Sequence, residues 1–298
     1  MYSGIIIVDK PAGWTSHDVI AKLRGALKQK RIGHGGTLDP MATGVLPVFI
    51  GRGTRAAEYS ENAEKEYIAT LKLGVITDTQ DITGNVLSKN AVDASYDDLY
   101  AILPQFRGTQ KQIPPMYSAI KKDGKKLYEL ARKGIDIPRE ARSISITSLE
   151  LLTQPDEQVA EHTYKLQVAC SKGTYIRTLC HDIGESLGCG GTLAALQRTR
   201  AGVYTLDMSH SLENILSAAS DGSFASDILL PIDSIFSDFP AIYLNESETR
   251  KAKNGAICQP QGENKDGKYR VYSPNNEFLL LGEVQNNKVK TIKSFFEV

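Results

Sequence analysis

Apolar and polar residues alternate along several stretches of the chain, and this two-residue period predicts β-strands that are buried on one face. The clearest stretch is EYIATLKLGV, in which Tyr67, Ala69, Leu71 and Leu73 fall on the same face. The stretches RSISITSLELL and YKLQVAC have the same period. Two continuous apolar runs, GIIIV near the N-terminus and GVLPV after Asp39, predict strands that are buried on both faces.

Other segments place apolar residues at the spacing of a helix. TSHDVIAKLRGALK begins with Thr15 and has Asp18 three residues later, which is the pattern of a capping box. A second helix is predicted from Ile176 to Leu187, ending at Gly188. The chain is therefore predicted to be a mixed α and β protein.

Two further regions differ from this main body. The segment from Lys111 to Gly134 is basic, begins irregularly at Pro114-Pro115, and predicts a short helix that Gly134 ends. In the last 60 or so residues, a polar helix ending near Asn254 and a hairpin formed by KYRVYS and FLLLGEV predict a small β module. The stretch ASDGSFASD upstream has the composition of a linker.

The composition, 41% hydrophobic and 23% charged over 298 residues, is typical of a globular protein with one large domain or a large and a small one. No run reaches the roughly 18 apolar residues of a membrane helix, and the N-terminus lacks the features of a signal peptide. The four cysteines form no CxxC pair, which favours free thiols in a cytoplasmic protein. The five histidines have no ligand spacing, so no metal site is expected.

Net charge is zero, but the charge is unevenly distributed. Residues 1–56 contain eight basic and three acidic residues, and residues 107–142 contain ten basic and four acidic residues. Residues 206–248 contain eight acids and no Lys or Arg. This pattern fits equally well a face that attracts a polyanion and a set of ordinary solvated segments.

The stretch GHGGTLDPMATGVLPV contains the most conspicuous candidate for chemistry, Asp39. Pro40 makes the backbone of Asp39 extended, and the glycines upstream allow a sharp turn or the close approach of a ligand. Asp39 is therefore predicted on a fixed, exposed turn in front of a packed strand. An aspartate in this setting is either a functional carboxylate or an ordinary turn cap. The loop lacks the GK[ST] of a P-loop and the GxGxxG of a dinucleotide fold, which argues against a nucleotide cofactor.

A second candidate stretch is CSKGTYIRTL, where a predicted strand passes through Gly173 into the second helix. Tyr175 and Arg177 are two residues apart, so on an extended chain their side chains share a face. A tyrosine ring can stack on a base, and a guanidinium can pair with a carboxylate or a phosphate. The same two residues also fit a buried tyrosine beside a surface arginine, and this ordinary interpretation is favoured when the stretch is taken alone.

Four motifs in order, DKPAGWTSHDV, GHGGTLDPMATGVLPV, KEYIATLKLGVITDTQD and SKGTYIRTLCHDIGESLG, resemble the TruB family of tRNA pseudouridine synthases. The resemblance extends from about Gly4 to Arg200 and continues more loosely to the C-terminus. It implies an α+β fold with a mixed, largely antiparallel central sheet flanked by helices. It also implies a catalytic domain over residues 1–236, with a thumb-like basic insertion at about 107–142, and a PUA-like RNA-binding domain over 237–298.

The resemblance also implies roles for individual residues. Asp39 matches the catalytic aspartate, and Arg177 matches the arginine that pairs with it and would keep it ionised. The other implied contacts to the substrate are His34, Tyr67, Tyr175 and Leu196, and the implied supporting residues are Lys10, Pro11, Gly35 and Gly36. The implied substrate is the T-arm of tRNA, at uridine 55, and the protein is expected to act as a cytoplasmic monomer without cofactor, metal or membrane.

Isomerising uridine to pseudouridine breaks the C1′–N1 bond and rejoins the uracil through C5, so it needs neither a redox cofactor nor ATP. The nucleotide must first leave its stack. Asp39 could attack C1′, attack C6 of the base or remove a 2′ proton, and the sequence leaves these three routes open. Two other classes also stay open: a tRNA-folding chaperone in which catalysis is secondary or lost, and an enzyme acting on free nucleosides or carbohydrates through Asp39.

Overall fold

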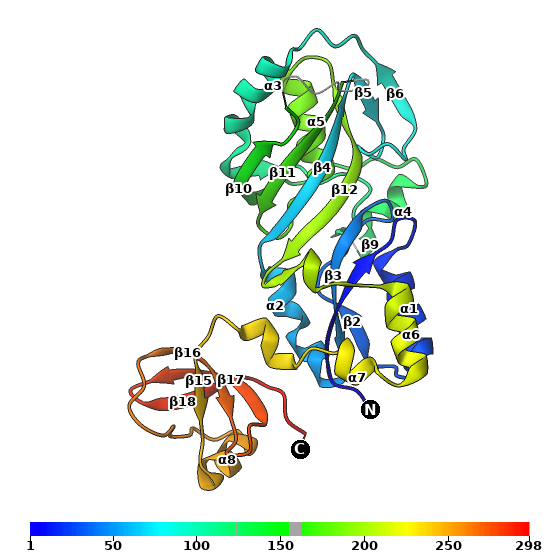
Figure 1. Ribbon diagram of the computed structural model, residues 1–298. Coiled ribbons are helices and arrows are strands. Elements are labelled where there is room, and N and C mark those ends of the chain that lie inside the picture. The colour runs from blue at the N-terminus through cyan, green and yellow to red at the C-terminus, as the bar shows by residue number, and fades with distance from the viewer. Residues whose placement is uncertain (123, 155–161, 298) are drawn as a thin grey trace.

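The protein, described here by a computed structural model covering residues 1–122, 124–154 and 162–297, is built around one large mixed sheet (Figure 1). The strand order is β14-β1-β3-β12-β4-β11-β10-β7, with β13 beside β12 and β2 beside β3. All of these pairs are antiparallel except β1 with β14 and β3 with β12. The strands are β1 (Gly4–Lys10), β2 (Ile32–His34), β3 (Thr43–Ile50), β4 (Lys65–Leu73), β7 (Gly108–Gln112), β10 (Arg142–Leu151), β11 (Thr163–Cys170), β12 (Gly191–Ala201), β13 (Tyr204–Thr205) and β14 (His210–Ser211).

This architecture confirms the predicted fold class and the strands expected from alternation. In β4 the residues of the expected inner face, Ala69, Leu71 and Leu73, are buried in the central core. The runs GIIIV and GVLPV form β1 and β3, whose apolar side chains are almost completely buried. All four cysteines are free and buried.

Helices lie along the sheet and at its end. The main-body helices are α1 (Ser16–Ala26), α2 (Ala57–Asn62), α3 (Tyr96–Ile102), α5 (Ile176–Ser186), α6 (Leu212–Asp221) and α7 (Phe224–Asp227). The predicted capping box is present: Thr15 Oγ1 accepts from Asp18 N, and the Asp18 carboxylate accepts from Thr15 N. The second predicted helix is α5, which ends before Gly188, a residue with φ of +75° that favours glycine. None of the described helices has the length and apolar content of a membrane span.

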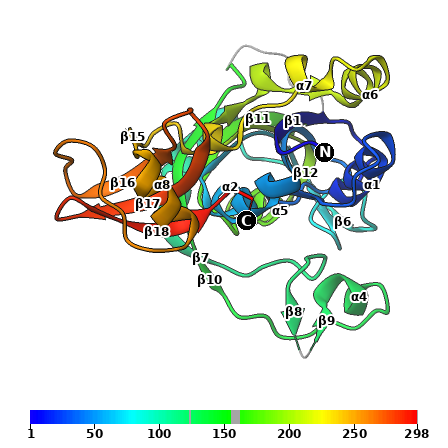
Figure 2. The same cartoon turned by 90° about the horizontal axis from the view of Figure 1, so that it is seen from below.

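The basic insertion (residues 107–142) begins with β7 at the edge of the sheet and returns to it as β10. Between them lie the short strands β8 (Lys121–Lys122) and β9 (Lys125–Lys126) and the helix α4 (Leu127–Ala131). Figure 2 shows this part standing away from the large sheet. The predicted short helix is thus confirmed, and Gly134 follows it with φ of +70°. Asp123, counted above among its acids, lies outside the described residues.

The C-terminal module is a separate sheet with the order β15-β16-β17-β18. Its elements are β15 (Ala241–Tyr243), α8 (Glu246–Lys253), β16 (Gly267–Tyr272), β17 (Phe278–Gln285) and β18 (Lys288–Ser294). β16 and β17 form the expected hairpin, and α8 is the expected polar helix. Phe278 and Phe295 pack with Phe236 of the preceding segment, and Lys293 Nζ lies 2.7 Å from Glu58 Oε1. The module is therefore held against the main body.

The prediction of a linker at ASDGSFASD, residues 219–227, is wrong. This stretch contains the end of α6 and all of α7, and Phe224 is fully buried, with its ring 4.9 Å from that of Tyr2. One aromatic side chain anchors a segment whose glycine and serine content alone suggested a linker. The shorter strands β5 (Val75–Thr77) and β6 (Val86–Lys89) form a hairpin after β4.

Candidate active site

The Asp39 loop (residues 35–42) connects β2 to β3 and is pinned by its neighbours. Leu38 is 3% exposed, and both its N–H and its carbonyl bond to Ser16 Oγ at the start of α1. Ala42 N donates to Asp39 O at 3.0 Å, and β3 packs behind. The side chain of Asp39 is 36% exposed, so the loop holds an accessible carboxylate on a rigid support, as predicted.

The glycines of this loop are needed for close packing. A Cβ on Gly35 would lie 2.5 Å from the Ser60 side chain, whose hydroxyl donates to Gly35 O at 3.1 Å. Gly36 has φ of +116°, which a side chain rarely tolerates. Gly35 and Gly36 therefore act as structural supports of the loop.

Lys10 stabilises the Asp39 loop through hydrogen bonds to backbone carbonyls. Its side chain is fully buried, and Nζ donates to the carbonyls of Pro11 at 2.8 Å, Trp14 at 2.6 Å and Pro40 at 3.3 Å. Burial lowers the pKa of Lys10 to about 8, and the nearby Asp39 charge opposes this shift. The ammonium thus ties the turn after β1 to the residue that follows Asp39.

Arg177 forms the central ion pair of the site. Its Nε lies 2.9 Å from Asp39 Oδ2, and its side chain is only 6% exposed. Nη1 donates to Thr79 O at 3.0 Å and lies 3.7 Å from Oδ2 of Asp81, a buried carboxylate. Nη2 donates to Tyr117 O in the basic insertion at 2.9 Å. This one side chain therefore joins the Asp39 loop, the turn after β5 and the insertion.

Tyr175 lies close to Arg177 in the sequence, but the two side chains do not share one face of an extended strand as predicted. It is the residue before α5, with extended backbone, whereas Arg177 is already helical, so the two do not share a face of an extended chain. The Gln112 side chain bonds both the N–H and the carbonyl of Tyr175, at 2.8 and 3.1 Å. Burial raises the pKa of Tyr175, and the Asp39 charge adds to the rise.

Tyr67 and Leu196 lie on one face of neighbouring strands. Leu196 of β12 is opposite Ala69 of β4, and Tyr67 is opposite Arg198, so the side chains of Tyr67, Leu196 and Arg198 point to the same side. Tyr67 is half-buried, and burial raises its pKa, with a smaller contribution from Asp39. Leu196 is 8% exposed and belongs to the central core.

His34 ends β2 on the other side of the loop. Its ring is 5.7 Å from that of His17, and Nδ1 is buried without a hydrogen-bond partner. Burial, together with the charges of His17 and Arg198, lowers the pKa of His34 to about 4. His34 is therefore neutral at physiological pH.

Two charged residues here, Asp81 and Arg198, were not predicted from the sequence. Asp81 lies within a quoted motif but had no assigned role, and it is 6% exposed beside Arg177. Arg198 is two residues after Leu196 in the same strand, and the two-residue period could have placed it on the Tyr67 face. Among the residues that the structure describes, no group of His, Cys, Asp and Glu is arranged to hold a metal ion.

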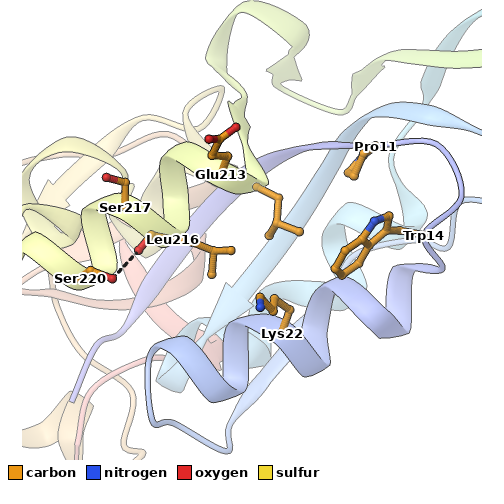
Figure 3. A pocket seen from close by; sticks show the side chains of 8 residues that line it. Pro11, Trp14, Lys22, Glu213, Leu216, Ser217 and Ser220 are labelled. Carbon is orange, nitrogen blue, oxygen red and sulfur yellow. Dashed lines mark hydrogen bonds between the residues drawn. The ribbon is translucent and has the colours of Figure 1, made fainter.

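A hollow of about 590 Å³ lies between α1 and α6 (Figure 3), and Asp39 is not among the residues that line it. Trp14 and Leu216 face each other across it, with Lys22 and Glu213 at the edges. Pro11 and Trp14, which also line it, accept hydrogen bonds from Lys10 through their carbonyls.

An accessible aspartate paired with a buried arginine, beside a large mixed sheet that is followed by a small C-terminal β domain, is the arrangement that the resemblance to a pseudouridine synthase implies. The family models agree with this class. The N-terminal domain of TruB family pseudouridylate synthases matches residues 24–176, and the tRNA pseudouridylate synthase B C-terminal domain matches residues 177–237. The chain belongs to the TruB family.

Curated relatives are similar over nearly their whole length. The chain is 42% identical over 290 residues to tRNA pseudouridine synthase B of Syntrophomonas wolfei subsp. wolfei, covering 97% of this chain and 96% of that one. It is 44% identical over 286 residues to the protein of the same name from Ectopseudomonas mendocina, covering 95% and 92%. Among solved structures, Cbf5 in a Cbf5-Nop10-Gar1 complex aligns with a TM-score of 0.73 and 25% identity, covering 98% of this chain and 85% of that one.

Proposed function

We propose that the protein isomerises uridine 55 in the T-arm of tRNA to pseudouridine, with Asp39 as the catalytic residue. The observation that carries this proposal is the 2.9 Å ion pair between Asp39 and the buried Arg177, which holds a partly exposed carboxylate in one orientation. The relatives named tRNA pseudouridine synthase B support tRNA as the substrate.

We assign each site residue either to contact with the substrate or to support of the Asp39 loop. Tyr67 and Leu196 would flank the uracil after the nucleotide leaves its stack, at a cost of a few kcal/mol. Tyr175 would contact the substrate beside Arg177, and His34 would contact the extruded nucleotide. Lys10, Pro11, Gly35 and Gly36 keep the loop in place.

The basic insertion and the C-terminal module would bind the RNA outside the site. Residues 107–142 carry ten basic residues, and the insertion reaches the site through Tyr117 and Arg177. We assign catalysis to residues 1–236 and RNA binding also to residues 237–298. Because phosphate contacts release counterions, binding is expected to weaken as salt rises. A tRNA substrate supports a cytoplasmic location, and we expect the chain to act there as a monomer.

Asp39→Asn tests the proposal, because it keeps the shape of the side chain and removes its negative charge. The expected result is loss of tritium release from [5-³H]uridine-labelled tRNA, with an affinity for tRNA, measured by filter binding, within several-fold of wild type. Mapping pseudouridine in tRNA treated with wild type tests the position. Substantial turnover by Asp39→Asn would remove Asp39 from the mechanism, and modification only outside the T-arm would contradict the substrate.

A further inference from the structure

Arg198 is the largest of the fully buried side chains, at 1% exposure, and it lies beneath the Asp39 loop. Its Nε donates to Val45 O at 2.7 Å, and its Nη2 donates to Gly36 O at 3.2 Å. Gly36 precedes Asp39 by three residues, and Val45 follows it in β3. One guanidinium therefore holds the chain on both sides of the catalytic residue.

The loop closes tightly over residue 198. A Cβ on Gly36 would lie 3.7 Å from Arg198 Nη1, and a Cβ on Gly44 would lie 2.2 Å from Arg198 O. Gly44 also has φ of +95°. At Gly44 the backbone can approach residue 198 this closely only because the position is glycine, whereas a Cβ on Gly36 would make an ordinary van der Waals contact.

The charge of Arg198 has no carboxylate partner among the described residues. No ion pair of the described chain includes Arg198, Lys10 or Lys65, whereas Arg177 has both Asp39 and Asp81. Lys65 is buried like Lys10, and its Nζ bonds only the carbonyls of Ser60, Glu61 and Ala63. Burying a charge without a counter-ion is costly. The buried cations Arg198, Lys10 and Lys65 would therefore stabilise a negative charge that develops in the site.

Arg198 is also directly opposite Tyr67 in the β4–β12 pairing. Burial is the main cause of the lowered pKa of His34, Lys10 and Lys65, and the charge of Arg198 adds to each of these shifts and opposes the rise that burial causes in the pKa of Tyr67, so its field reaches both sides of the Asp39 loop. Tyr67 is the residue that we place against the uracil, which puts the positive charge of Arg198 at the base end of the site.

We propose that Arg198 is a positioning residue for the isomerisation: it fixes the Asp39 loop, and its buried charge stabilises the uracil while the base holds the electron pair of the broken C1′–N1 bond. This inference rests on the proposed function. When the bond breaks, both electrons stay with the base, on any of the three routes open to Asp39. When C5 then bonds to C1′, the C5 proton leaves and N1 takes up a proton, so charge and atoms balance. Preorganised charge in a site that excludes water is an effective way to stabilise such an anion.

Arg198→Gln and Arg198→Lys separate charge from shape, with Arg200→Gln as the matched control. Arg200 lies in the same strand, but it pairs with Glu64 and Glu66 at 2.7 and 2.6 Å. In single-turnover assays on tRNA, Arg198→Gln is expected to be slower by about 100-fold or more, the effect of losing one preorganised donor. Arg198→Lys should lose only about tenfold, Arg200→Gln should stay within about twofold, and tRNA affinity should change by less than several-fold in all three.

A second measurement detects the charge itself. Because Arg198 lowers the pKa of His34, this pKa, followed by NMR of the imidazole, should rise in Arg198→Gln and stay low in Arg198→Lys. A folded Arg198→Gln with near wild-type single-turnover rate would overturn the inference. The inference would also be overturned if Arg198→Lys were as slow as Arg198→Gln and the His34 pKa were the same as in wild type in both variants.

If Arg198→Gln does not fold, Arg198→Lys tests the inference alone. A His34 pKa equal to that of wild type, with a single-turnover rate within about tenfold of wild type, supports the inference. A rate about 100-fold below wild type at the same His34 pKa contradicts it. These failures are distinguishable from failure of the proposed function, in which wild type itself would form no pseudouridine in tRNA.

Discussion

Arg177 Nε lies 2.9 Å from Asp39 Oδ2, although Asp39 is in the loop before β3 and Arg177 is in the first turn of α5. The same guanidinium lies 3.7 Å from the buried Asp81 carboxylate. Asp81 is itself held by Thr79 Oγ1 at 2.9 Å and by Thr83 N at 3.0 Å. Asp81 therefore sets the position from which Arg177 holds Asp39.

Asp81→Asn is expected to lower turnover on tRNA by at least about tenfold, or about 1.4 kcal/mol of barrier. The change leaves Arg177 with one carboxylate fewer and weakens its hold on Asp39, which we propose acts in the reaction and not in RNA binding. Single-turnover rates and filter binding should show a larger loss in rate than in affinity. Asp78→Asn is the control, because among the described residues the Asp78 carboxylate accepts hydrogen bonds from Asn85 in the same hairpin and from no other residue. Equal rates for the two variants would refute the role of Asp81.

Tyr67→Phe is expected to reduce turnover more than tRNA affinity. Burial raises the pKa of Tyr67, so its hydroxyl stays protonated at neutral pH and can donate to a group on the reacting base. The ring itself, and any stacking, are kept in the variant. Tyr59→Phe, where the ring packs on Phe236 away from the site, serves as control. Equal losses of rate and affinity in Tyr67→Phe would indicate a purely structural tyrosine.

The depressed pKa of His34, about 4 against the usual 6.5, makes stability depend on pH. Between these two values the unfolded chain binds a proton that the folded chain does not, so the free energy of unfolding falls as pH falls through this window. His34→Gln removes this dependence. Urea unfolding at pH 7 and pH 5 should therefore show a drop for wild type that exceeds the drop for His34→Gln by about 1 kcal/mol or more. His210→Gln, in β14, should behave like wild type, and equal drops in all three would contradict the low pKa.

Gly44→Ala is expected to destabilise the fold by about 2 kcal/mol or more, because φ is +95° and the new Cβ would lie 2.2 Å from Arg198 O. Gly25→Ala is the matched control. Gly25 lies exposed in α1, with nothing within 4 Å of a new Cβ, and alanine is the better helix former there. Urea denaturation of the two variants should give changes of opposite sign, and a neutral Gly44→Ala would show that the loop can move away from residue 198.

Local patterns predicted local structure well. The pair Thr15 and Asp18 predicted the start of α1, the alternation from Tyr67 to Leu73 predicted β4, and Gly188 predicted the end of α5. Each of these signals lies within one turn of helix or one strand, so the residues that carry it are close in both sequence and space.

The parts that were not predicted depend on distant partners. Arg198 is buried because Gly36 and Val45 supply its acceptors, and no pattern within β12 indicates them. Phe224 converts a glycine- and serine-rich segment into packed structure because it is buried in the central core, where its ring lies 4.9 Å from that of Tyr2. The Asp39–Arg177 pair was implied by family resemblance alone, since the face-sharing argument for Tyr175 and Arg177 failed where α5 begins.

The hydrogen bond from Arg177 Nη2 to Tyr117 O connects the insertion directly to the group that orients the Asp39 carboxylate. A nucleic acid that shifts the insertion would move the same guanidinium whose Nε faces Asp39. If the insertion binds RNA and Asp39 is catalytic, as we propose, substrate binding and the orientation of Asp39 are coupled through this one side chain.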